Sequence, residues 1–471
     1  MTDLASAAAY LPALVEAQVR QYRVPGAQVA VRTEEGLLAS FAVGTADLST
    51  GEPLRTDHLF RIASHSKTFT GTAIMQLVEA EKIRLDDPIE RHVEELAGSG
   101  IGRATVRELL EHQSGIQRDG TDADFWQLER PFPDRAGLVA EILAHGTIAD
   151  RNAYFRYSNV GYSLLGLAIE SASGESYAEY CRTHIVEPLR LTRTGAEYAP
   201  ERAAEYAAGH TGQLLGEDER LVIEHVDTRA MAAATGFYST AEDLTVYGAA
   251  HWHGSDALIS DDSKRIMQRT ASVISRYGNE IGRYGVGIEI AKIRERNLVG
   301  HSGGYPGHIT RTYIDPVGKL VVSVLTNAVD GAAEQIAQAV LAVIDAAEAA
   351  LPGAEKKPAS ADGPAAASFT GRYASLWGMT DVVELDGRLV LVSPGARDVH
   401  ATMDELEIVD ADTLRTFLQP SFGASGEPVS FTRRGDGTVA SIRVNGMTQW
   451  PLDDFLARRE SMTRILKEPV T

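Results

Sequence analysis

The sequence predicts a mixed α/β (α+β) protein in which an antiparallel sheet, flanked by helices, is interrupted by a helical insertion and followed by a small all-β domain. Strand-like segments lie near the start of the chain and again between residues 285 and 326, whereas residues 66–250 are mainly helical. A stretch rich in Pro, Lys and Ala then precedes several short strands. We therefore expect a main domain over residues 1–350, a linker over 351–367 and an accessory barrel or sandwich over 368–471.

The elements of the main domain follow from hydrophobic spacing. Apolar residues at helical intervals predict an N-terminal helix that stops at Pro25. Two strands joined by a hairpin turn come next, at 28–33 and 37–43. The second half of the sheet is expected at 285–291, 298–301, 309–314 and 319–326. A closing helix carries Ile336, Val340 and Val343 on one face.

The accessory domain is indicated by turn residues between short β segments. Asp386-Gly387 separates strands expected at 382–385 and 388–392, which is a strong hairpin signal. A further Gly-rich turn precedes a strand at 439–444. Short strands at this spacing are typical of a small barrel or sandwich.

Composition narrows the function classes. The 471 residues carry a net charge of −20, which disfavours nucleic acid and anionic membranes as partners. The N-terminus shows no signal peptide and no apolar run is long enough to span a bilayer, so we expect a cytoplasmic protein with no membrane partner. The partner we expect is a small-molecule or peptide substrate, and a homo-oligomer is left as an option.

No cofactor is indicated. The sequence has neither a dinucleotide-binding Gly-x-Gly-x-x-Gly after a strand nor a phosphate-binding Gly-Lys-Ser/Thr loop. Cys181 is the single cysteine and is interpreted as a packing residue in a helix. His251 and His253 have no ligand pattern around them and are interpreted as surface histidines, so no metal is expected.

Ser64 and Lys67 form the most informative pair. A short apolar run leads into Ser64 and a helix follows, so two residues three apart share one face at the helix start. Burial and the positive end of the helix dipole both lower the pKa of a lysine placed there. A neutral lysine can take the proton of a serine hydroxyl, which predicts a serine nucleophile with a lysine base.

Two later segments supply further candidates. Tyr157 and Asn159 lie two apart in a loop, where the tyrosine can carry a proton and the amide can hold a substrate carbonyl. His301 and Gly303 face the same side of an expected strand, and glycines there are expected to let a substrate backbone approach closely.

With these motifs in order, the chain resembles the penicillin-recognising, β-lactamase-like serine hydrolases, on the branch of class C β-lactamases, D-aminopeptidases and esterases. The motifs are Ser-x-x-Lys, Tyr-x-Asn and His-x-Gly, and the segments 109–115 and 236–244 match two further landmarks of the family. The second landmark also reads as a capping box formed by Ser239 and Glu242. The resemblance covers roughly residues 5–350 and implies a β-lactamase/transpeptidase-like fold.

The resemblance also implies roles for these residues. Ser64 is the implied acylated nucleophile, and Lys67 and Tyr157 share the general-base work. Asn159 contacts substrate, and the backbone N–H groups of Ser64 and Gly304 form an oxyanion hole.

The resemblance places substrate-binding residues on the expected strand as well, at His301, Ser302 and Gly303. Many relatives carry a cationic lysine where His301 stands, and a histidine is mostly neutral at pH 7. An ester, an amide or a peptide recognised from its amino end is therefore the expected substrate. The expected reaction is hydrolysis of small esters, amides or D-amino-acid-containing peptides and amides through a Ser64 acyl-enzyme.

Three alternatives remain open. The segment 300–304 also spells Gly-x-Ser-x-Gly, which would make Ser302 the nucleophile of an α/β-hydrolase elbow. The same fold could transfer the acyl group to an amine or alcohol, or the chain could be a non-catalytic binding or scaffold protein. Four aromatic residues could line the pocket or belong to the core: Phe125, Trp126, Tyr238 and Tyr305.

Overall fold

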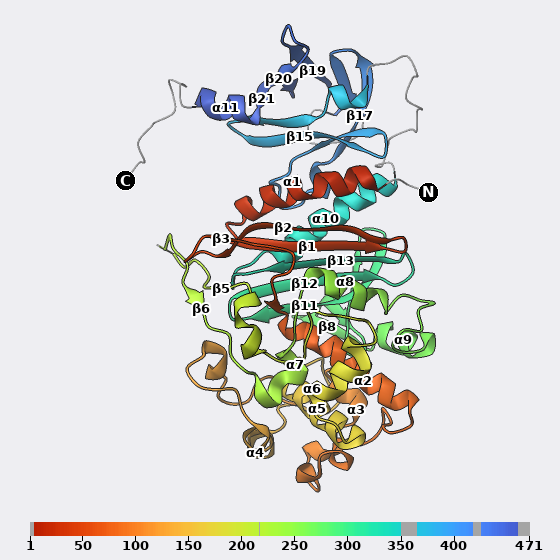
Figure 1. Ribbon diagram of the computed structural model, residues 1–471. Coiled ribbons are helices and arrows are strands. Elements are labelled where there is room, and N and C mark those ends of the chain that lie inside the picture. Colours follow the sequence, from red (N-terminus) through yellow and green to blue (C-terminus); the bar gives the residue numbers. More distant parts are fainter. Residues whose placement is uncertain (1–3, 216, 350–364, 418–424, 460–471) are drawn as a thin grey trace. The chain divides into compact units, whose positions relative to one another are not determined.

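The computed structural model describes residues 4–215, 217–349, 365–417 and 425–459 (Figure 1). The chain divides into two compact units. One is Tyr22–Ala337, and the other joins the N-terminal segment up to Gln21 to the segment that begins at Gln338. The expected linker lies outside the described residues except for its last three positions, and the domain boundaries at 350 and 368 stay a prediction.

The unit formed by Tyr22–Ala337 is built on a nine-stranded antiparallel sheet in the order β3-β2-β1-β13-β12-β11-β10-β9-β8. In that order the strands are β3 (Glu52–Pro53), β2 (Gly36–Asp47), β1 (Gly26–Thr33), β13 (Leu320–Thr326), β12 (His308–Asp315), β11 (Arg296–Tyr305), β10 (Glu289–Ile293), β9 (Asn279–Tyr284) and β8 (Ser272–Arg276). The two halves join where β1 pairs with β13, with Val29 opposite Val324. Every residue of β13 is buried, which explains why its sequence is apolar except for Ser323 and Thr326.

A helical insertion separates β4 (Phe60–Arg61) from β8, as expected (Figure 1). Its α-helices are α2 (Ser66–Glu79), α3 (Val106–Leu110), α4 (Arg135–His145), α5 (Asn159–Ser173), α6 (Tyr177–Cys181), α7 (Ala232–Thr235), α8 (Ala241–Ala249) and α9 (Asp261–Gln268). Helix α8 packs on the sheet, where the backbone N–H of Ala241 donates to Gln28 Oε1 at 2.6 Å. Helix α2 is buried along nearly its whole length and contacts α5 and α7.

Two details of this unit differ from the sequence analysis. The edge strand β8 and its neighbour β9 were not predicted, because exposed polar side chains break their hydrophobic alternation. The capping box of Ser239 and Glu242 is wrong: the N-cap of α8 is Thr240, whose side chain accepts from the N–H of Asp243 at 3.2 Å. Ser239 lies in the short strand β7 (Tyr238–Ser239), and its hydroxyl contacts Thr194 at 2.8 Å.

Phe69 on α2 gives a test of this core. Its ring is fully buried and stacks on Phe237 and Tyr247, with ring centroids 4.2 and 3.8 Å away. Truncation removes both contacts and leaves a cavity between α2 and its neighbours. Phe69→Ala should lower the free energy of unfolding by about 3–5 kcal/mol, measured by urea denaturation. A change below about 1 kcal/mol would contradict this packing.

The second unit contains a closed barrel, which decides between the barrel and the sandwich. Its strands are β14 (Gly371–Ser375), β15 (Gly378–Leu385), β16 (Arg388–Val392), β17 (Asp404–Asp410), β18 (Thr413–Thr416), β19 (Pro428–Arg433), β20 (Val439–Val444) and β21 (Met447–Pro451). The barrel is followed by α11 (Leu452–Arg459). Phe369 and Phe431 meet edge-to-face in its core, with centroids 5.0 Å apart. Closure pairs every strand on both sides and so removes free sheet edges.

Helix α1 (Ala5–Gln21) belongs to the same compact unit as the barrel. The Tyr10 hydroxyl donates to Asp381 Oδ2 at 2.7 Å, and Arg372 holds the same carboxylate at 2.8 Å. Helix α10 (Ala333–Glu348) is the expected closing helix, and its last turns belong to this unit. No helix within the described ranges has both the length and the apolar character needed to cross a membrane.

Candidate active site

Ser64 lies in a single 3₁₀ turn (Ala63–His65) between β4 and α2. Ala63 has φ of 47°, a left-handed conformation that costs an L-residue about 1–2 kcal/mol. The turn is fixed from two sides: the Ser66 hydroxyl donates to the Ala63 carbonyl at 2.6 Å, and His65 Nε2 contacts Thr312 Oγ1 on β12 at 3.0 Å. The backbone of the expected nucleophile is thus held against the sheet.

The Ser64 hydroxyl meets both of the expected bases. Lys67 Nζ lies 3.2 Å from Ser64 Oγ, and the Tyr157 hydroxyl lies 2.7 Å from the same oxygen. Lys67 is fully buried, and its Nζ donates to Asn159 Oδ1 at 2.7 Å and to the carbonyl of Ala234 at 2.8 Å. The structure therefore brings Ser64, Lys67, Tyr157 and Asn159 together, as the sequence predicted.

The surroundings of Lys67 suit a neutral amine. Burial lowers the pKa of Lys67 well below its ordinary value, because desolvation penalises the ammonium. A neutral amine has two N–H groups, which match the oxygens of Asn159 and Ala234, and one lone pair left for the Ser64 proton. Burial also raises the pKa of Tyr157, so its hydroxyl stays protonated at neutral pH and can donate to Ser64 Oγ.

Asp119, which the sequence analysis missed, sets the orientation of Asn159. Its Oδ1 accepts from Asn159 Nδ2 at 2.6 Å and from Trp126 Nε1 at 3.0 Å. A carboxylate only accepts, so the Asn159 amide must turn its nitrogen to Asp119 and its oxygen to Lys67. No sequence signal links position 119 to position 159, because a loop and a helix separate them.

Asp119→Ala should lower kcat about 10- to 100-fold, because Asn159 and then Lys67 lose their fixed orientation. Asp119→Asn should recover most of the activity, since its carbonyl oxygen can still accept from Asn159. Steady-state kinetics on the two variants measure the difference. Equal losses in both would show that the charge of Asp119, and not the orientation it imposes, is what matters.

Buried His112 holds the loop that carries Tyr157. Its Nδ1 accepts from the N–H of Ser158 at 3.1 Å, its carbonyl accepts from the N–H of Arg156 at 2.7 Å, and its ring lies 4.4 Å from the Tyr157 ring. Ser158 is the N-cap of α5, accepting from the N–H of Gly161 at 2.9 Å. The segment 109–115, noted above only as a family landmark, thus has a structural reason: it fixes the tyrosine.

Strand β11 brings the His-x-Gly segment to the same place. His301 is buried; its Nε2 lies 3.0 Å from the Tyr284 hydroxyl and its Nδ1 lies 2.6 Å from the Ser302 carbonyl. Burial lowers the pKa of His301 to about 4, so the ring is neutral at pH 7. The Ser302 hydroxyl donates to Glu289 Oε1 at 2.8 Å, and Arg311 pairs with the other oxygen of that carboxylate. Neither Glu289 nor Arg311 was a sequence candidate.

The two glycines after Ser302 differ in their surroundings. A Cβ on Gly303 would lie 2.2 Å from the Ile62 carbonyl and 2.4 Å from Thr310 Oγ1. The expectation that this glycine leaves room for a substrate is therefore corrected: the backbone leading to Ser64 takes that room. A Cβ on Gly304 would meet only a side-chain carbon of Ile309, at 3.5 Å, so the space beside Gly304 is open.

The nucleophile-elbow alternative is wrong. It requires Ser302 at a sharp turn from a strand into a helix, whereas Ser302 lies within β11 and β12 follows through a tight turn. The hydroxyl is also bonded to Glu289.

Other candidates lie in the core. His251 is buried rather than on the surface, with its Nε2 3.4 Å from Thr72 Oγ1. Cys181 is fully buried, and burial raises the pKa of its thiol to about 12, which fits a packing role. Phe125, Tyr238 and Tyr305 are buried, whereas Trp126 is partly exposed and joins the site through Asp119.

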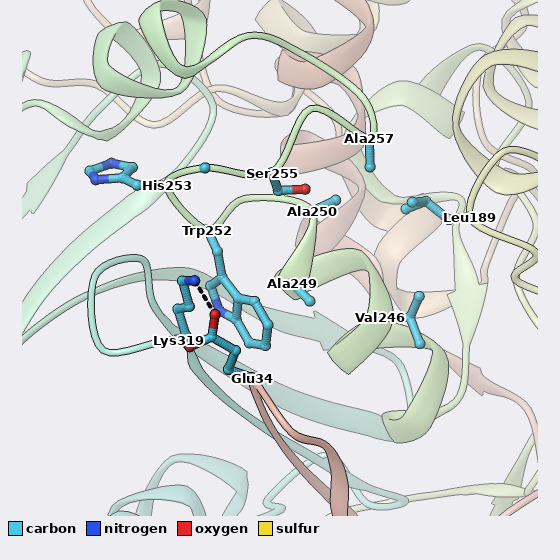
Figure 2. A pocket seen from close by; sticks show the side chains of 11 residues that line it. Glu34, Leu189, Val246, Ala249, Ala250, Trp252, His253, Ser255, Ala257 and Lys319 are labelled. Atoms are coloured by element: carbon cyan, nitrogen blue, oxygen red, sulfur yellow. Dashed lines mark hydrogen bonds and ion pairs between the residues drawn. The ribbon is translucent and has the colours of Figure 1, made fainter.

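A pocket elsewhere in the same unit is lined by Leu189, Val246, Trp252 and Ser255, with the Glu34–Lys319 ion pair at its side (Figure 2). None of the sequence-predicted site residues lines it. Within the described ranges no group of three or more His, Cys, Asp or Glu side chains has the arrangement of a metal site.

Comparisons with known proteins point to one family. The family model described as Beta-lactamase matches residues 11–347. Penicillin-binding protein 4* of Bacillus subtilis (strain 168) is 30% identical over 295 residues, which are 59% of this chain and 63% of that protein. The match thus spans somewhat less than two thirds of the relative's length.

Two solved structures share the fold. The structure described as an octameric penicillin-binding protein homologue from Pyrococcus abyssi is 23% identical, with a TM-score of 0.63 over 94% of this chain and 99% of that one. A D-stereospecific amidohydrolase from Streptomyces sp. is 26% identical, with a TM-score of 0.60 over 70% of this chain and 97% of that one.

Proposed function

The chain belongs to the beta-lactamase family, and from this we propose that it is a serine hydrolase that works through a covalent Ser64 acyl-enzyme. The observation that carries the proposal is the contact of one hydroxyl with two proton-handling groups. Ser64 Oγ lies 3.2 Å from a buried lysine and 2.7 Å from a tyrosine hydroxyl. A serine with a base in this position is an activated nucleophile.

The proposed reaction has two steps. In the first, Ser64 gives its proton to the Lys67 amine while Oγ attacks the substrate carbonyl carbon. The carbonyl oxygen becomes an oxyanion, which the backbone N–H groups of Ser64 and Gly304 hold. Collapse breaks the bond to the leaving amine or alcohol, which takes a proton that Lys67 and Tyr157 relay. In the second step water attacks the Ser64 ester and gives one proton to the same groups. They return this proton to Ser64 Oγ as the ester bond breaks, which releases the acid and restores the hydroxyl.

We propose small esters, amides and D-amino-acid-containing peptides or amides as substrates. Similarity to a D-stereospecific amidohydrolase supports the amide and the stereochemistry. The ring of His301 is buried and neutral, so β11 presents no cation at this position for a substrate carboxylate. This supports substrates that need no carboxylate bound at His301. The remaining proposed contacts are Asn159, His301, Ser302 and Gly303, with Gly303 limited to its backbone.

Covalent labelling tests the nucleophile. A reactive fluorophosphonate, followed by mass mapping of the modified peptide, should place the label on Ser64. Turnover of ester and D-aminoacyl amide panels then identifies the substrate, and L-enantiomers serve as matched controls. A label on any other serine would overturn the assignment.

The same assays distinguish a hydrolase from two alternatives, an acyltransferase and a scaffold protein. An acyltransferase would give an acylated amine or alcohol when such an acceptor is supplied, whereas a hydrolase gives the free acid. A scaffold protein would show neither label nor turnover. The paired bases at Ser64 favour a working catalyst over a scaffold, because the chain buries a lysine for which packing alone offers no reason.

We also propose that residues 368–471 form an accessory domain. A second proposal is that the protein forms a homo-oligomer. The latter is supported by the relative described as octameric, which shares the fold over 94% of this chain. Light scattering during gel filtration of the full chain measures the oligomeric state.

A further inference from the structure

Arg118 is a cation held beside Tyr157, the tyrosine whose hydroxyl contacts Ser64. Its carbonyl accepts from the N–H groups of Asn159 and Val160 at 2.8 and 3.1 Å, which ties its backbone to the start of α5. Its guanidinium carbon lies 5.0 Å from the centroid of the Tyr157 ring, and its Nε donates to Asp119 Oδ2 at 3.0 Å. The residue is therefore held through its backbone and through two side-chain contacts, to the Tyr157 ring and to Asp119.

The outer end of Arg118 is open. The side chain is 66% exposed, and only its Nε has a hydrogen-bond partner among the described residues. Its two terminal nitrogens remain available, and these form the planar fork that binds a carboxylate with two parallel hydrogen bonds. Packing against Tyr157 does not explain why the charged end of Arg118 lies in solvent.

The other acidic and basic side chains of the site already have partners. Lys67 is buried and bonded to Asn159 and Ala234, and Arg311 is buried in its pair with Glu289. Glu289 and Asp119 are acceptors and would repel a substrate carboxylate. An acidic group that enters the site would thus meet a free cationic donor at Arg118.

We propose that Arg118 binds a carboxylate of the substrate and so selects acidic substrates. The proposal rests on the serine hydrolase function proposed above. Strand β11 carries no cation at His301 that could bind a substrate carboxylate. In this proposal Arg118, on the loop between α3 and α4, supplies that cation instead. The carboxylate can stand on the acyl part or on the leaving group, and the experiment separates the two.

The test uses matched substrate pairs that differ in one carboxylate. D-Alanyl-D-alanine and its C-terminal amide differ on the leaving group, and the 4-nitrophenyl monoester of adipic acid and 4-nitrophenyl hexanoate differ on the acyl part. In Arg118→Ala the KM of the acidic member of one pair should rise about 10- to 100-fold, with Arg118→Lys intermediate. Its neutral partner should change less than about twofold. The guanidinium of Arg118 is exposed, so added salt should screen its attraction for a carboxylate. Salt should therefore raise the wild-type KM of the acidic substrate but not that of its neutral partner.

Arg156→Ala is the charge-matched control. Arg156 is exposed and adjacent in sequence to Tyr157, and its side chain has no hydrogen-bond partner among the described residues. It should leave both pairs unchanged. Equal losses for acidic and neutral members in Arg118→Ala would show that Arg118 acts on Tyr157, and equal effects of the two arginine variants would show only general electrostatics. Either result overturns the proposal.

A binding measurement keeps this inference separate from the hydrolase proposal. Calorimetry with Ser64→Ala protein and D-alanyl-D-alanine or adipate requires no turnover. Binding of either acid that weakens at least tenfold in Ser64→Ala/Arg118→Ala supports the Arg118 site even if the wild type neither turns over substrate nor takes a label on Ser64. Unchanged binding in the double variant, or no binding by Ser64→Ala, would overturn the Arg118 site even in an active hydrolase.

Discussion

Replacement of Ser64 by alanine is expected to abolish covalent labelling and to lower kcat by about 10⁴-fold or more. The loss follows from the geometry, because Lys67 and Tyr157 both converge on the one oxygen that the substitution removes. Residual activity should reflect only the oxyanion hole and substrate positioning. Labelling with a fluorophosphonate and kinetics on the best substrate measure both effects.

Ser302→Ala is the matched control for this experiment. Ser302 also lies beside the site, but its hydroxyl is bonded to Glu289 and β11 holds it away from any strand-to-helix turn. The variant should keep the label on Ser64. A label that survives Ser64→Ala but disappears in Ser302→Ala would reverse the roles of the two serines. Circular dichroism and thermal unfolding should show that both variants keep the fold.

Local patterns explain why the sequence analysis could predict that Ser64 and Lys67 lie together. Ser64 and Lys67 are one helical turn apart, so their proximity is a property of the helix start. The hairpin of β1 and β2 and the strands β11 to β13 follow from alternation and from turn residues between apolar runs. Such features need only neighbours in the chain.

The parts that sequence analysis missed depend on contacts across the fold. Asp119 contacts Asn159, and Glu289 contacts Arg311, over separations of 40 and 22 residues. His65 reaches Thr312 over a separation of 247 residues. No local sequence pattern predicts which distant residue a carboxylate or histidine in a loop will contact. The same reason explains the misjudged Gly303, because only the folded chain shows that the Ile62 carbonyl lies against it.

The second large effect is expected at Lys67. Lys67→Met keeps the length of the side chain but removes the base, so kcat should fall by about 10³-fold or more. Lys67→Arg should not rescue it, because a guanidinium stays protonated and cannot accept the Ser64 proton. Substantial activity in Lys67→Met would instead assign the base to Tyr157 alone.

The pH dependence follows from the direction of the two pKa shifts. Lys67 acts as a base only when neutral, so kcat/KM should fall as the pH drops through its lowered pKa. Tyr157, whose pKa is raised above the ordinary value of 10, should stay protonated through the neutral range. The profile should therefore show an acidic limb, and Lys67→Met should lose it.

Stability should report the same titration without any substrate. Between the lowered pKa of folded Lys67 and the ordinary lysine pKa, the unfolded chain binds one proton more than the folded chain. The free energy of unfolding of the wild type, relative to Lys67→Met, should then rise with pH across this window. A difference independent of pH would mean that Lys67 stays charged in the folded protein, which would remove the argument for a neutral base.

Moving one charge provides the sharpest test of that argument. In Asp119→Asn/Asn159→Asp the net charge and the hydrogen bond between the two side chains are kept, but the carboxylate now faces Lys67 Nζ, where the amide oxygen lies at 2.7 Å in the wild type. An adjacent carboxylate stabilises the ammonium, so the pKa of Lys67 should rise and the acidic limb should move up by about 1–3 pH units. Activity lost at pH 7 should return in part at higher pH. A uniform loss at all pH values would show that the substitutions disturb geometry alone, because a change in proton affinity must be reversible by pH.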